Sequence, residues 1–117
     1  GIISPTTIGV LAAAKAIEDE GLQGKVELTG LGLPSEMQRY IENGTCGQMA
    51  LWNPVDLGYT ATYISEALIT GKIEGVEGEV IDAGRMGDIP VGAEGFAVMG
   101  APFVFDASNV ADFASIF

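Results

Sequence analysis

Apolar residues over the first seventy positions alternate between short continuous runs and helical spacing. Val10, Ala13, Ala14 and Ile17 fall at i, i+3, i+4 and i+7, which marks one face of a helix. The pattern predicts strands at 1–4, 25–29 and 48–52, and helices from Thr6 or Thr7 to the glycine at 21, from Pro34 to Asn43 and from Pro54 to Thr70. Strand and helix therefore alternate three times, which favours an α/β fold with parallel strands and a doubly wound layout.

Local residues indicate where these helices begin and end. Ser35 and Gln38 have the spacing of a capping box after Pro34. Asn43-Gly44 is a common helix end. In the third helix, a buried stripe is expected at Leu57, Ala61, Ile64 and Leu68. Beyond Gly71 the pattern is richer in glycine, and it predicts short strands at 79–82, 95–99 and 103–105 and a brief final helix within 108–117.

The run from Ala50 to Tyr59 contains the most informative chemistry. A short apolar strand ends in Trp52-Asn53, and Pro54 starts a helix. Small ligands bind at the carboxyl edge of open α/β sheets, where an indole offers a flat apolar face and an amide can donate and accept. A structural interpretation is also open, in which Trp52 is buried and Asn53 caps the helix.

The other two strand ends of this section are expected at the same edge. They carry Ser4-Pro5-Thr6-Thr7 and Gly30-Leu31-Gly32-Leu33-Pro34. The hydroxyls of Thr6 and Thr7 either cap a helix or face a ligand. The Gly30-x-Gly32 pattern lacks the third glycine and the acidic residue of a dinucleotide site. Hydroxyls, an amide and an indole without a paired base fit the binding of a neutral polyol better than catalysis.

Composition excludes several classes of function. The chain has 16 acidic and 5 basic residues, a net charge of −11, which argues against nucleic acid as a partner. It has no histidine, so a histidine-based catalytic site or metal site is absent. Cys46, the single cysteine, is expected to be structural, as are the methionines. We expect no enzyme activity, no metal and no cofactor.

Four segments, taken in order, resemble one family. They are 2–7 (Ile-Ile-Ser-Pro-Thr-Thr), 29–37 (Thr-Gly-Leu-Gly-Leu-Pro-Ser-Glu-Met), 50–59 (Ala-Leu-Trp-Asn-Pro-Val-Asp-Leu-Gly-Tyr) and 102–109 (Pro-Phe-Val-Phe-Asp-Ala-Ser-Asn). Together they resemble the carboxyl-terminal part of a type I periplasmic solute-binding protein of ABC transporters, in the rhamnose-binding and autoinducer-2-binding branch. The resemblance implies an incomplete three-layer, Rossmann-like lobe with a mostly parallel sheet.

The resemblance also implies a ligand and a site. The ligand is a small sugar, rhamnose-like, or the furanosyl signal autoinducer-2, held in a cleft between two lobes. In the autoinducer-binding relatives the residues matching Pro5 and Thr7 contact the ligand, and the motif with Trp52 and Asn53 lines the same cleft. Thr7 departs from the small apolar residue expected at its position, and its hydroxyl suits a sugar.

Residues 1–117 are accordingly expected to be the carboxyl-terminal part of a two-lobed protein, whose helix at about 54–70 crosses to a missing first lobe. Its partners would be an ABC permease in the membrane and the missing amino-terminal lobe, or a second copy if the chain self-associates. The expected location is the periplasm. The effector-binding core of a sugar-responsive transcription regulator is the alternative, because such regulators share this lobe architecture.

Overall fold

The computed structural model describes residues 1–116 and divides the chain into two compact units. The first unit contains Gly1–Leu51 and the segment that starts at Pro102, and the second contains Trp52–Ala101. The last position of the predicted final helix, Phe117, lies outside the described residues.

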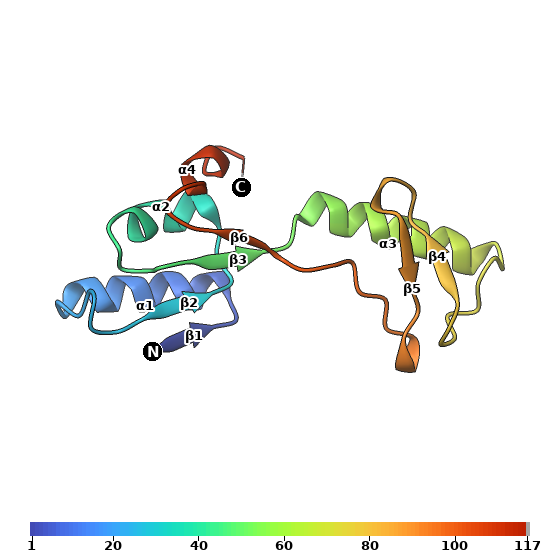
Figure 1. The fold of residues 1–117 in the computed structure, drawn as a ribbon, viewed down its shortest axis with the longest axis horizontal. Helices are drawn as coiled ribbons and strands as arrows, with labels where there is room; N and C mark the ends of the chain where they lie inside the picture. Colours follow the sequence, from blue (N-terminus) through green and yellow to red (C-terminus); the bar gives the residue numbers. More distant parts are fainter. Residues whose placement is uncertain (117) are drawn as a thin grey trace. The chain divides into compact units, whose positions relative to one another are not determined.

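The first unit is built on a mostly parallel sheet (Figure 1). Its elements are β1 (Ile2–Ser4), α1 (Thr7–Asp19), β2 (Leu28–Gly30), α2 (Pro34–Glu42), β3 (Met49–Leu51), β6 (Phe103–Phe105) and α4 (Val110–Phe113). β1 and β2 pair in parallel, a parallel bridge joins Leu31 to Ala50 beside β3, and β6 pairs antiparallel with β3. The predicted α/β class and the three predicted strand-helix alternations are confirmed.

Both long helices of this unit share one core with the same face of the sheet. The core contains Val10, Ala14 and Ile17 of α1, Met37, Tyr40 and Ile41 of α2, and Leu28, Met49 and Phe105 of the strands. Strands in the order β1, β2, β3 with right-handed crossovers place successive helices on one side. Because the chain order does not reverse here, the described part is wound on one face only, and the doubly wound layout is not present within it.

The start of α2 differs from the prediction. The residue before the helix is Leu33, whose side chain makes no capping hydrogen bond, and Pro34 occupies the first turn. Ser35 therefore lies inside the helix, and Gln38 donates to Glu42 Oε1 at 2.7 Å instead. The predicted capping box is wrong, because the residue that precedes α2 is Leu33, two positions before Ser35, and Pro34 occupies the first turn.

The second unit packs one helix against a β-hairpin. Its elements are α3 (Pro54–Ile69), β4 (Val80–Asp82), the short 3₁₀ turn η1 (Gly84–Met86), β5 (Asp88–Pro90) and a second turn, η2 (Ala93–Gly95). Ile81 pairs with Ile89 across the hairpin, and both are buried. The predicted strand at 95–99 is wrong, since only a single bridge joins Val91 to Ala97.

The buried face of α3 matches the predicted stripe only at Ile64. Thr60 and Ala67 are buried, with Tyr63 and Ile64 packed beside the hairpin core, whereas Leu57 is 55% exposed and Leu68 45%. The helix is apolar on more than one side, so its spacing did not identify the side that meets the hairpin.

Cys46 is structural, as predicted. Its thiol is buried, and its Sγ lies 3.3 Å from each of the carbonyl oxygens of Leu28 and Gln48, which share the single thiol proton. Burial raises the pKa of this thiol. Among the described residues, no helix has both the length and the apolar character needed to cross a membrane.

Removing the Met37 side chain tests the shared core. Met37 of α2 is fully buried in the core that it shares with α1 and β3, so Met37→Ala should lower the free energy of unfolding by about 2–5 kcal/mol. Chemical denaturation measures this loss. Ser35→Ala is the matched control and should be neutral, because Ser35 is exposed and is not the cap; a clear loss in the control would restore the capping box.

Glu79 folds the loop before β4 around its carboxylate. The carboxylate accepts the N–H groups of Glu74, Gly75 and Val76 at 2.8–3.1 Å. These donors, that of Glu74 first, lower the pKa of Glu79 below its ordinary value of 4.5. A lowered pKa in the folded state means that the stabilisation is present above that ordinary value and is lost as the pH falls through the lowered pKa.

We therefore expect Glu79→Gln to lower stability at neutral pH and to flatten the loss of stability on acidification. Thermal unfolding between pH 7 and pH 3 measures both effects. Glu77→Gln is the control, since Glu77 is exposed and changes the net charge equally. Equal pH profiles for the two variants would contradict a stabilising role for the hydrogen bonds to the Glu79 carboxylate.

Candidate functional site

The carboxyl ends of the parallel strands form one edge of the first unit. Leu31 N–H donates to Ser4 O at 2.9 Å, which ties the segment after β2 to the end of β1. Gly32 N–H donates to Ala50 O at 3.3 Å and ties the same segment to β3. The loops that lead into α1 and α2 thus begin at one edge, as the sequence predicts for a ligand site.

Pro5, Thr6 and Thr7 make the turn from β1 into α1. Thr6 is the cap of α1, and its Oγ1 accepts the Gly9 N–H at 3.0 Å. Pro5 and Thr6 are exposed and Thr7 is half-buried. Because a hydroxyl can accept and donate, Thr6 keeps its proton for another partner while it caps the helix. Within residues 1–116, no hydrogen bond uses the Thr7 hydroxyl.

Gly9 allows the hydroxyls of Ser4 and Thr6 to lie close to the first turn of α1. A Cβ at this position would lie 2.4 Å from Ser4 Oγ and 2.7 Å from Thr6 Oγ1. Glycine is unfavourable inside a helix by about 1 kcal/mol, so its presence in the first turn is explained by this close approach. Sequence reasoning missed Gly9, although a glycine within a predicted helix was visible.

Gly30 serves packing rather than phosphate binding. Its φ is +156°, and a Cβ there would lie 2.0 Å from Ser4 O. The glycine therefore allows the backbone after β2 to pass against the end of β1. This contact accounts for the glycine without a nucleotide.

Trp52 and Asn53 follow β3 and belong to the second unit. The Trp52 indole is 39% exposed, and its Nε1–H donates to Gly100 O at 3.0 Å. Asn53 is exposed and caps α3, with Oδ1 accepting the Val55 N–H at 2.9 Å. The predicted cap is thus confirmed and the predicted buried Trp is not. The ring face of Trp52 and the Nδ2 group of Asn53 are left for other contacts.

A cluster that the sequence did not reveal holds the first turns of α3. The Arg85 guanidinium lies 2.5 Å from Asp56 Oδ1 and 4.4 Å from the centre of the Tyr59 ring. Arg85 N–H also donates to the Tyr59 hydroxyl at 3.2 Å. A hydrogen bond from Tyr63, with that of Arg85, lowers the pKa of Tyr59. Arg85 is the single basic residue in the acidic run 74–88, which was the available sign of an ion pair.

The five predicted site residues thus form two groups. Pro5, Thr6 and Thr7 lie together at the start of α1 in the first unit, and Trp52 and Asn53 lie together at the start of α3 in the second. All five are uncharged, and they present hydroxyls, an amide and an aromatic face. Among residues 1–116, no group of three acidic, cysteine or histidine side chains is placed to hold a metal ion.

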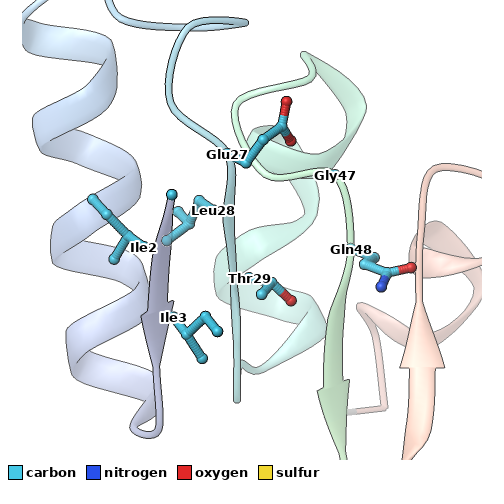
Figure 2. Close-up of a pocket in the computed structure, with 8 residues that line it drawn as sticks. Ile2, Ile3, Glu27, Leu28, Thr29, Gly47 and Gln48 are labelled. Atoms are coloured by element: carbon cyan, nitrogen blue, oxygen red, sulfur yellow. The ribbon is translucent and has the colours of Figure 1, made fainter.

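A separate hollow lies on the open face of the first unit's sheet (Figure 2). It has a volume of about 560 Å³ and is lined by β1, β2 and the residues before β3, including Ile3, Thr29 and Gln48. None of the five predicted residues lines it. Ile3 is 80% exposed there, so the hollow reflects a sheet face that the described helices do not cover.

Comparison with protein families identifies the class. Residues 1–73 match the family model described as the periplasmic binding protein domain. The matched region includes β1, β2, β3 and both predicted groups of site residues. This chain therefore belongs to the periplasmic binding protein family, as its sequence motifs predict.

Two solved structures are similar over 96% of the chain. One is a sugar ABC transporter from Actinomyces odontolyticus ATCC 17982, with 43% sequence identity and a TM-score of 0.78. The other is LsrB from Clostridium saccharobutylicum in complex with AI-2, with 21% identity and a TM-score of 0.75, a likeness that shows the fold alone. The chain spans 36% and 39% of the lengths of these two proteins.

The capping role of Thr6 can be separated from any ligand contact. Thr6→Ala should lower the free energy of unfolding by about 1 kcal/mol, because the Gly9 N–H loses its acceptor. Thr6→Ser should retain most of that stability. Thr7→Ala, one residue further on, is the matched control and should leave the cap intact. Urea denaturation measures all three; equal losses for Thr6→Ala and Thr7→Ala would contradict the assignment of the cap.

Proposed function

We propose that this chain is part of the substrate-binding component of an ABC importer for a small neutral sugar. The observation that carries the proposal is the set of uncharged hydroxyl, amide and indole groups at the starts of α1 and α3. The 43% identical structure described as a sugar ABC transporter supports the same cargo class. The protein then acts by binding and release in the periplasm, and no bond of the sugar is broken.

Each proposed residue has a physical role. The Trp52 ring face stacks on the C–H face of the sugar. Asn53 Nδ2 and the Thr6 hydroxyl donate to sugar oxygens, while the oxygen atoms of both side chains already serve as helix caps. Thr7 offers a hydroxyl with no partner among residues 1–116, and Pro5 gives a rigid surface beside it.

A rhamnose-like sugar suits these groups better than autoinducer-2. The Thr7 hydroxyl adds a donor and acceptor at a position where a small apolar residue is expected for the autoinducer. An apolar indole face suits a sugar with a hydrocarbon surface. The structure in complex with AI-2 is only 21% identical, so it supports the fold of this chain and not its ligand.

We further propose that residues 1–117 form the carboxyl-terminal part of a two-lobed protein, with α3 crossing to the first lobe. The chain leaves the first unit after Leu51 and returns to it at Pro102, which supports the crossing. Leu57, Leu68 and Ile69 of α3 are exposed, and an apolar surface of this kind invites a partner. The missing lobe is the proposed partner, with self-association as the outcome for the isolated chain. The membrane permease would then accept the loaded form.

Calorimetric titration of the two-lobed protein tests the cargo. We expect L-rhamnose to bind and autoinducer-2 to bind more weakly or not at all. Trp52→Ala should weaken the binding of the sugar about tenfold or more, equivalent to about 1.4 kcal/mol, because the stacking surface is lost. Phe96→Ala is the matched control, since Phe96 is an aromatic residue that is 68% exposed and lies outside the proposed site.

The outcomes of this titration are distinct. Binding of L-rhamnose that Trp52→Ala weakens and Phe96→Ala preserves supports both the cargo and the site. Binding that neither variant changes would remove Trp52 from the site. If neither L-rhamnose nor autoinducer-2 binds, the proposed cargo is wrong.

Thr7 distinguishes between the two ligands. Thr7→Val replaces the hydroxyl with a methyl group of similar size. It should therefore weaken the binding of the sugar by about fivefold to tenfold, because one hydrogen bond is lost. Ligand competition measured by the same calorimetry checks this. A gain in autoinducer-2 affinity together with loss of the sugar would show that Thr7 selects the cargo; unchanged affinity for both would exclude it from the site.

A further inference from the structure

The chain passes between its two units twice, and each unit fixes the two passing segments by one contact close to the boundary. In the first unit, Leu51 of β3 is paired with Phe103 of β6. In the second unit, Trp52 Nε1–H donates to Gly100 O at 3.0 Å. The outgoing segment at Leu51-Trp52 and the return segment at 100–103 are therefore joined on either side of the boundary.

The indole contact is the main restraint on the return segment within the second unit. Gly100 has a φ of +136°, and Pro102 has no backbone N–H to donate. Among residues 1–116, no other hydrogen bond joins residues 52–54 to residues 99–102. The return segment would otherwise depend on residues with unusual backbone freedom or without a donor.

The same contact fixes the indole. The Trp52 indole has a single donor, and Gly100 O occupies it. The indole can then offer a ligand its ring face but no hydrogen bond, and the bond to Gly100 O restricts the orientation of its side chain. Ordering a side chain before the ligand arrives removes part of the entropic cost of binding.

We propose that Trp52 is a positioning residue, which clasps the return segment at Gly100 and holds its own ring in place for a ligand. The inference about the ligand rests on the proposed function; the clasp itself does not. The clasp also limits separate movement of the outgoing and return segments.

The test removes the N–H and keeps the ring. In the full-length protein that contains this chain, Trp52 is replaced by its benzothiophene analogue, in which sulfur takes the place of the indole N–H. Trp52→Phe is a second variant that lacks the donor and uses ordinary expression. NMR relaxation of the ligand-free protein gives the order parameters of the Gly100 and Ala101 amides, with the Ile81 and Ile89 amides of the hairpin as internal controls.

With the clasp, both amides should be rigid in the unmodified protein, near an order parameter of about 0.85, and fall towards about 0.6 in both variants. The hairpin amides should not change. Unchanged order parameters at Gly100 and Ala101 in both variants would overturn the clasp.

Titration of L-rhamnose with the same proteins tests the consequence for binding. The benzothiophene variant, which retains the stacking surface, should bind about threefold to tenfold more weakly. Loss of order with unchanged sugar affinity would overturn the positioning role. If no variant or parent binds the sugar, the relaxation result still decides the clasp, and only the proposed function fails.

Discussion

The antiparallel pairing of β3 with β6 is the constraint on which both units depend. Its register sets Met49 opposite Phe105 and Leu51 opposite Phe103, so Phe105 joins the core formed by α1, α2 and β2. Because β6 must return to the edge beside β3, residues 52–101 have to leave and re-enter the first unit at adjacent points. The second unit is therefore an insertion whose ends are fixed by strand pairing. The pairing of β3 with β6 therefore fixes where the chain enters α3 after Trp52 and where it returns after Gly100.

Two of the proposed site residues, Thr6 and Asn53, lie where helices begin and serve as their caps. Thr6 and Asn53 each use a side-chain oxygen to satisfy an N–H in the first turn of a helix, a requirement of any helix end. Each still has a donor group after that bond is made. Both side chains are therefore already oriented by their structural roles, and a side chain held in this way would lose little freedom on binding a ligand. Gly9 is needed beside Thr6, because a side chain at position 9 would displace the hydroxyls of Ser4 and Thr6.

The second unit relies on polar contacts to supplement a small core. Its buried apolar residues are few, centred on Ile81, Ile89 and Val91. The Glu79 carboxylate gathers three backbone N–H groups, and Arg85 joins the hairpin turn to Asp56 and Tyr59 of α3. Exposed ion pairs contribute little by themselves, but these bonds set the geometry of two loops that the small core cannot position. Leu57, Leu68 and Ile69 of α3 stay exposed outside this small core.

The sequence by itself determined the order of strands and helices over the first seventy residues, the structural role of Cys46 and the family, while it left the cap of α1 open between Thr6 and Thr7. Local signals suffice for these features, because capping, helical spacing and short motifs act over a few residues. The tertiary structure alone decided which face of α3 is buried, that Asp88–Pro90 is a strand, and that the Trp52 indole donates to Gly100. Aspartate and proline disfavour strands locally, yet Ile89 between them finds a buried partner in Ile81. Such contacts join residues far apart in the chain, and no local pattern records which of several apolar faces or polar groups will meet.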